Sequence, residues 1–494
     1  MKIKTEFLKL SKTLHTWTGI ISGIFLFICF IAGGLSVFQY QITQWSTPPQ
    51  QVVNYTPQNI NQFIQAVQKQ VPITQDHFTL NLSNNVSHKI PMIWQEGHST
   101  WTANIQNNHL KVEQQQPSEL GHLIELLHET AGIPTHIGHE KTGVILMGFI
   151  SLLYFIAIIS GLILHLPTLV KDYLVIRKTK NKKRFLLDMH NVVGITNLPF
   201  HIIISLTVIV FAFHDVFFTI LSNLTGQTIF NKPIISEQYI QKKPLDIKQI
   251  LLKTNHIAPN YQVDYMDFNH LQNQSQAVVR IAIYNSDNML RGANHNFVIM
   301  NPYTLEVTNK FFLNANGIEQ FIQSMFALHF GSFNGIWTRW LYFILGIGGA
   351  FLFYTGNLLW IQSRKNKNNL SVKILEKITT GAMIGSVLAI SLVMATTKWV
   401  VILGFPKNLL NLYFIYGYYF IFTLSIFYCL ITDSKKSLKH LLFLTALSLF
   451  SFIFTSIIAF CVPTFGLWVN ILSVDITAFF LAICFWYIYK KRSG

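Results

Sequence analysis

Long apolar blocks alternate with polar stretches along the 494-residue chain. Eight of these blocks reach the length of about 20 residues that an α-helix needs to cross a lipid bilayer. The first block is longer than the ~7–15 apolar residues of a signal-peptide core, which favours an uncleaved helix. The pattern therefore predicts an all-α polytopic membrane protein of about eight transmembrane helices, with spans at 17–40, 142–166, 191–217, 336–361, 378–400, 409–432, 441–462 and 466–489.

Two long polar insertions interrupt the spans, at 41–141 and 218–335. Each predicts a helix followed by three strands, so we expect two small α+β modules of related design. The helices are expected at 59–70 and 247–254, and the strands at 78–82, 92–94, 100–105, 261–268, 277–284 and 297–300. The other predicted segments are a first helix at 1–40, helices two and three with a basic loop at 142–217, a fourth helix at 336–365 and a four-helix block at 366–494.

The charge pattern adds one thing to this prediction, the orientation of the helices in the membrane. Charged residues make up 12% of the chain and the formal net charge is +16. The lysines and arginines stand in short clusters next to apolar ends, mainly at 171–184, 364–377, 435–439 and 490–492, and all of these ends fall on one side of the predicted membrane. The excess of positive charge on cytoplasmic loops then predicts both termini inside and both insertions outside. Because the charges form no single patch, we expect no nucleic-acid partner.

The four cysteines all lie inside apolar blocks, and the sequence contains no CxxC or CxxCH motif. A disulfide framework, a zinc ribbon and a covalently attached c-type haem are therefore not expected.

Histidines mark the predicted ends of the helices. Among the 18 histidines, one group lies at the predicted inner face, another at the outer face, and His201 lies within the third span. His201 follows His190 by eleven residues, which is close to three turns of a straight helix, so we expect both on one face, with His201 roughly 16 Å deep. The inner group is His15, His165 and His190, and the outer group is His128, His139, His214 and His329.

This arrangement suits a six-coordinate b-type haem, whose iron takes two neutral imidazoles on opposite faces, usually from different helices. Ionisable groups inside a membrane are costly, which makes them functional candidates. The alternatives stay open for each residue. His15 and His190 could be interfacial histidines, His128 and His329 could cap helices, and His201 could bond a backbone carbonyl near Pro199.

Four motifs in order resemble those of PepSY-associated transmembrane proteins. LHTWTG at 14–19 opens the first span, and LDMHNVVG at 187–194 is followed by LPF at 198–200. An outer motif has Leu127-His128 and then Gly132, and LHFG at 328–331 precedes a span that ends in YTGNLLW at 354–360. The resemblance covers about residues 1–365, and the rest of the chain has no counterpart in it.

The family is similar to iron-regulated inner-membrane proteins of Gram-negative bacteria, which include ferric-siderophore reductases that bind two haems. The resemblance implies PepSY-like modules in the periplasm and electron transfer from an inner to an outer haem b, then to a ferric siderophore. The motif histidines that would bind haem iron are His15, His128, His190 and His329, and His201 is a further candidate. We expect His15 to pair with His190 and His128 with His329. Since the inner loops are too short for a nicotinamide or flavin domain, a quinol or another membrane donor is expected to supply electrons.

Two other functions remain possible from sequence. A non-redox PepSY membrane module could bind or regulate a periplasmic partner. A transporter of iron or a siderophore would give the last four helices a role, but substrate pathways usually carry carboxylates, and Asp475 is the only plausible one here.

Overall fold

The computed structural model divides into two compact units, which are described separately. A membrane unit comprises Met1–Pro48, Ser118–Phe217 and Trp340–Gly494, and a sheet unit comprises Pro49–Pro117 and Phe218–Arg339. The structure describes residues 4–47, 57–82, 91–97, 99–106, 109–114, 118–134, 136–137, 140–177, 181–226, 244–285, 287–290, 292, 295–310, 317–365, 369–406, 409–462, 464 and 471–493.

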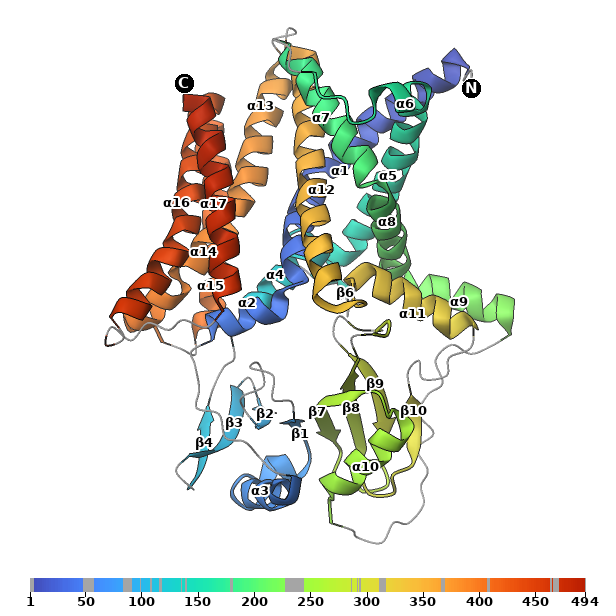
Figure 1. Cartoon of the computed structure of the whole chain (residues 1–494), viewed down its shortest axis with the longest axis vertical. Helices are drawn as coiled ribbons and strands as arrows, with labels where there is room; N and C mark the ends of the chain where they lie inside the picture. Colours follow the sequence, from blue (N-terminus) through green and yellow to red (C-terminus); the bar gives the residue numbers. More distant parts are fainter. Residues whose placement is uncertain are drawn as a thin grey trace. The chain divides into compact units, whose positions relative to one another are not determined.

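Apolar helices build the membrane unit (Figure 1). In the described residues, seven helices are long and apolar enough to cross a membrane, and a bent pair makes an eighth span. The expected multi-pass helical fold is confirmed. The helices are α1 (Thr5–Ser36), α2 (Gln39–Ser46), α4 (Leu120–Thr130), α5 (Thr142–His165), α6 (Leu169–Asp172), α7 (Lys182–Thr196), α8 (Leu198–Ala212), α9 (His214–Thr225), α12 (Gly335–Arg364), α13 (Leu370–Thr379), α14 (Gly385–Ile402), α15 (Leu410–Ile431), α16 (Ser434–Cys461) and α17 (Leu472–Ser493), with a π-helical turn at Thr380–Ile384.

The third predicted span is not one straight helix. α7 and α8 meet at Asn197 with a bend of 68°. Pro199 has no N–H to continue the α7 ladder, and its ring is tolerated only in the first turn of a new helix. The expectation that His190 and His201 share one helix face is therefore wrong, because the axis turns between them.

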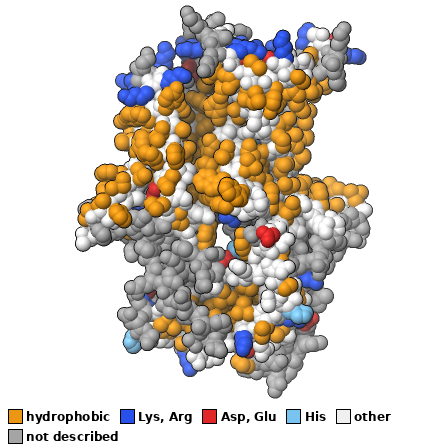
Figure 2. Space-filling view, in the orientation of Figure 1, with side chains coloured by type: hydrophobic (Ala, Val, Ile, Leu, Met, Phe, Trp, Pro, Cys, Tyr) orange, Lys and Arg blue, Asp and Glu red, His pale blue; other side chains and the backbone are white. Residues whose placement is uncertain are grey.

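Lysines and arginines gather at the end of the membrane unit where α7 begins and α17 ends (Figure 2). Hydrophobic side chains cover the helices beyond this basic band, as expected for a lipid-facing surface. The exposed lysines there include Lys182, Lys183, Lys435, Lys436, Lys490 and Lys491. The clustering agrees with the charge pattern of the sequence, and the side of the membrane on which it lies stays a prediction.

Both insertions contribute to one antiparallel sheet in the sheet unit. Its eight strands run in the order β10-β9-β8-β7-β1-β2-β3-β4, symmetric about the central β1–β7 pair. Leu80 pairs with Met266 there, and the Thr79 hydroxyl donates to Asp267 at 2.8 Å. The strands are β1 (Phe78–Asn81), β2 (Met92–Glu96), β3 (Ser99–Gln106), β4 (His109–Gln114), β7 (Gln262–Asn269), β8 (Val278–Tyr284), β9 (Asn296–Met300) and β10 (Val307–Lys310); β5 (His136–Ile137) and β6 (Glu140–Lys141) form a separate pair.

Two helices, α3 (Pro57–Gln70) and α10 (Ile247–Ile257), cover one face of this sheet. Their buried side chains, including Phe63 and Ile250, form one core with Leu80, Met266 and neighbouring strand residues. The Asn61 amide bonds Asp246 and the backbone N–H of Ile247, which ties α3 to the start of α10. The two predicted α+β modules are thus present, each with a fourth strand, and they share one core. A further helix, α11 (Gly317–Phe330), precedes α12.

Candidate functional site: paired histidines between helices

His15 and His190 are neighbours within the membrane unit. His15 lies on α1 and His190 on α7, and their ring centroids are 6.1 Å apart with an angle of 70° between the ring planes. The predicted meeting of these two histidines is therefore present in the structure. It joins residues that are 175 positions apart in the sequence.

Each of these imidazoles is held through Nδ1 by a further helix. His15 Nδ1 donates to the carbonyl of Ala157 on α5 at 2.9 Å, and His190 Nδ1 lies 3.2 Å from the carbonyl of Leu352 on α12. The Thr355 hydroxyl, also 3.2 Å from His190 Nδ1, bonds the same carbonyl. A carbonyl only accepts, so Nδ1 carries the proton in both rings and Nε2 keeps its lone pair. No described residue hydrogen-bonds either Nε2.

Glycine lets both rings lie directly against a neighbouring helix. A Cβ atom added to Gly161 on α5 would lie 2.8 Å from His15 Cε1. One added to Gly356 on α12 would lie 3.3 Å from His190 Cε1. Because side chains on these helices would push the rings aside, the glycines fix where the imidazoles lie.

The donor set and its spacing fit a b-type haem. A metal–imidazole bond is about 2 Å long and the ring centroid lies roughly 1 Å behind the nitrogen, so two axial imidazoles on one iron have centroids roughly 6 Å apart. The separation of 6.1 Å matches this value. A backbone carbonyl on Nδ1 is also the usual outer partner of a metal-bound imidazole. In the described parts of the chain no three His, Cys, Asp or Glu side chains form a metal cluster, whereas haem iron needs only two protein ligands.

His201 lies deeper in the unit, inside a cage of aromatic rings. Its side chain is 1% exposed, and Nδ1 bonds the hydroxyl of Tyr154 on α5 at 2.5 Å. Nε2 is buried and has no hydrogen-bond partner in the structure, so a carbonyl bond of the expected kind is not formed. Its ring neighbours are Phe30, Tyr154, Phe200 and Phe353, with centroids between 5.7 and 6.4 Å from the imidazole.

His128 lies near the other end of α1. It occupies the last turn of α4, where Nδ1 donates to the carbonyl of Cys29 at 3.0 Å and lies 3.5 Å from its sulfur. Cys29 follows His15 by fourteen residues, so the two histidine positions are about 21 Å apart along α1. The membrane unit thus holds one histidine site toward each end of the same helix.

The other predicted histidines are distributed differently. His329 ends α11 in the sheet unit, so its pairing with His128 joins two units and stays a prediction. His165 ends α5, and His214 Nδ1 bonds the carbonyl of Phe211 at 2.9 Å. His139 lies outside the described residues.

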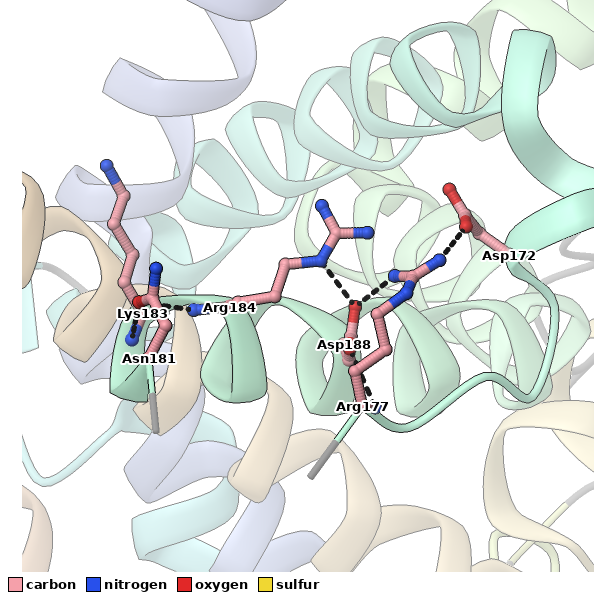
Figure 3. A network of polar contacts seen from close by, with 6 residues as sticks. All are labelled: Asp172, Arg177, Asn181, Lys183, Arg184 and Asp188. Atoms are coloured by element: carbon pink, nitrogen blue, oxygen red, sulfur yellow. Dashed lines mark hydrogen bonds and ion pairs between the residues drawn. The ribbon is translucent and has the colours of Figure 1, made fainter. Parts of the chain in front are cut away.

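A network of ion pairs fixes the start of α7 near His190 (Figure 3). Asp188 is 3% exposed and accepts from the backbone N–H and the guanidinium of Arg177, both at 2.9 Å. Arg184 lies one turn before it and pairs with the same carboxylate at 3.2 Å, while Arg177 also bonds Asp172. Asn181 caps the first turn by accepting from two backbone N–H groups. The network joins the α6–α7 loop to Asp188 of α7, two residues before His190.

Sequence reasoning singled out Asp475 but missed the buried polar cluster at the C-terminal block to which it belongs. Lys398 on α14 is 1% exposed, and its Nζ lies 4.4 Å from the ring centroid of Trp45 on α2. The Trp45 indole donates to Asp475 at 3.0 Å, and the Ser456 hydroxyl donates to the other carboxylate oxygen at 2.7 Å. A lysine inside an apolar block was the signal in the sequence that could have located this cluster.

The model of one protein family matches most of the chain. Residues 12–363 match the PepSY-associated TM region. The match includes His15, His128, His190 and His329, and it ends before α13. No curated protein matches the chain.

Proposed function

Since the chain belongs to the PepSY-associated TM region family, we propose that it is a haem-containing reductase of the bacterial inner membrane. Electrons from a quinol or another membrane donor would cross the bilayer and reduce a ferric siderophore in the periplasm. Siderophores hold ferric iron through hard oxygen donors that bind ferrous iron much less tightly. Reduction would therefore aid iron release and uptake.

The pairing of His15 with His190 is the observation that carries this proposal. Two neutral imidazoles from different helices, 6.1 Å apart between centroids, are the residues that would hold the haem iron. A b-type haem held there would supply one-electron chemistry. The carbonyls of Ala157 and Leu352 orient the rings and keep the Nε2 lone pairs available. Both imidazoles are partly buried among the surrounding helices.

We propose His128 and His329 as the ligands of a second haem on the periplasmic side. Sites toward the two ends of α1 suit stepwise electron passage across a membrane about 30 Å thick. His201 is then a neighbour of the electron route, bonded to Tyr154, and not an axial ligand. The carboxylate of Asp475 is bonded to Trp45 and Ser456, which favours a structural role over a transport pathway.

The first experiment measures haem in the purified protein. We expect a b-type α-band in the dithionite-reduced spectrum and two haems per chain by pyridine haemochrome. His190→Ala should remove about one equivalent, because one axial ligand is lost. The matched control is His256→Ala, which changes an exposed histidine of α10 and should leave the haem content unchanged.

The outcome decides between the candidate functions. Purified protein without a b-type spectrum would overturn the reductase and leave a PepSY membrane module that binds a periplasmic partner. Electron passage is tested in vesicles loaded with a ferric trihydroxamate and a ferrous-specific dye, with dithionite added outside. Dye colour is expected with the wild-type protein, and no colour is expected with His190→Ala.

A further inference from the structure

We propose that the C-terminal block, residues 366–494, is a clamp that holds α4 and thereby positions His128. The block lies beyond the family match, which ends at residue 363. Its α15 binds both ends of α4, the short helix that carries this histidine. The contacts that form the clamp all lie within the membrane unit, and its effect on haem rests on the proposed function.

α4 needs outside partners at both ends. At its start, the N-cap residue Glu119 provides no side-chain cap. At its end, Ala131 and Gly132 turn the chain out of the helix with φ angles of 49° and 83°, so the Gly132 carbonyl, two residues past Thr130, lies outside the helical hydrogen-bond ladder. A helix of eleven residues is too short to be stable on its own in water.

α15 supplies a partner at each end. The side-chain oxygen of Asn411 accepts from the backbone N–H of Glu119 at 3.0 Å, and the Tyr419 hydroxyl donates to the carbonyl of Gly132 at 3.0 Å. Asn411 and Tyr419 are eight residues apart, or about 12 Å along α15, which is close to the length of about 16 Å for α4. The two helices therefore run side by side with a polar bond near each end.

Between these two hydrogen bonds, apolar side chains pack α4 against the C-terminal block. Leu120, Leu123, Ile124 and Leu127 follow the spacing of one helix face and are at most 4% exposed. They share one core with side chains of the block, including Phe414 and Tyr418 of α15, Phe452 of α16 and Ala482 of α17. His128 comes directly after the last of these leucines and contacts α1.

The buried polar cluster fastens α2 to the same block. Asp475 accepts from Trp45 at 3.0 Å, and Lys398 lies over the Trp45 ring. The Ser46 hydroxyl on α2 bonds that of Ser118, two residues before α4, at 2.5 Å. A buried aspartate and lysine are costly in a membrane protein. Both side chains contact Trp45 of α2, the helix that bonds Ser118 just before α4, so they have a place in the clamp.

The experiment removes the two end bonds in the full chain. The variants are Asn411→Ala, Tyr419→Phe and their double, with Tyr416→Phe as control, because Tyr416 lies on the same helix and is 68% exposed. Asn411→Asp keeps the acceptor and should behave as the wild type. Amide hydrogen exchange in 120–132 should become at least about tenfold faster in the double variant, because both hydrogen bonds that hold the ends of α4 are lost.

The haem readout separates positioning from general stability. In redox titration and electron paramagnetic resonance, the double variant should change the potential and signal of one haem and leave those of the His15–His190 haem unchanged. The clamp would be overturned if amide hydrogen exchange in the double variant were as slow as in the wild type. Equal changes in the potentials of both haems would also overturn it. If the wild-type protein binds no haem, the proposed function fails, and the exchange measurement alone then decides whether the clamp exists.

Discussion

At the scale of single residues, glycine lies beside every buried or half-buried histidine of the candidate site. Each of these imidazoles contacts a backbone position where a Cβ atom would come closer than ordinary van der Waals contact. The sequence motifs located the histidines, but they gave no sign of which glycines on other helices would meet them. Such pairs depend on helix packing, which has no local signature. The pairs are Gly161 with His15, Gly356 with His190, Gly349 with His201 and Gly33 with His128.

Gly161→Ala is predicted to damage the inner haem site without changing a ligand. The new methyl group would lie 2.8 Å from His15 Cε1, and overpacking of this kind costs about 1–3 kcal/mol. Haem binding there should weaken roughly tenfold or more. Titration of the apoprotein with haem measures the effect. Gly19→Ala on α1 is the control, since open space surrounds that position; an equal effect from both variants would contradict the prediction.

At the scale of elements, hydropathy and charge predicted the membrane helices well. Long apolar runs determine where a span lies, since exposed backbone polar groups are costly in lipid. The bend of 68° between α7 and α8 was missed because hydropathy does not register a break in the hydrogen-bond ladder. β4 and β10 were missed for another reason. Both are short edge strands with only one or two apolar residues each, too few for a clear strand signal.

Asp188→Asn is predicted to loosen the start of α7. The change removes the charge that pairs with Arg177 and Arg184, and hydrogen bonds to charged groups contribute about 1.5–3 kcal/mol each. We expect a lower unfolding temperature and reduced haem content at the His15–His190 site. Lys183→Gln is the control, because Lys183 enters the network only through its backbone N–H. A variant that keeps both the wild-type melting curve and the haem content would show that the network does not support His190.

At the scale of the whole molecule, the two insertions together form one eight-stranded sheet. The sequence predicted related modules but not their union, because the β1–β7 pairing joins segments far apart in the chain and nothing local specifies it. Their helices also share one core, in which Phe63 of the first insertion and Ile250 of the second are both buried. The sheet unit should therefore unfold as one cooperative body.

Leu80→Pro is predicted to disrupt both insertions together. Proline in the central strand β1 removes a donor from the ladder beside β7, where the cost is greatest. Limited proteolysis should then cut within 57–114 and within 244–310 at similar rates. Lys111→Pro changes the edge strand β4 and should open only the first range. Cleavage of the first range alone in Leu80→Pro would mean that the halves are independent.

The shared sheet has a consequence for biosynthesis. β1 is complete at Asn81, but its partner β7 begins at Gln262, roughly 180 residues later in the chain. At about 5–20 residues per second, the ribosome needs roughly 10–40 s to supply that partner. During this interval two further spans must insert while β1 presents an unpaired edge, which is a template for aggregation. The exposed edge of β1 in the nascent first insertion therefore needs protection from aggregation in the compartment where it emerges. A chain that ends before β7 would need that protection permanently.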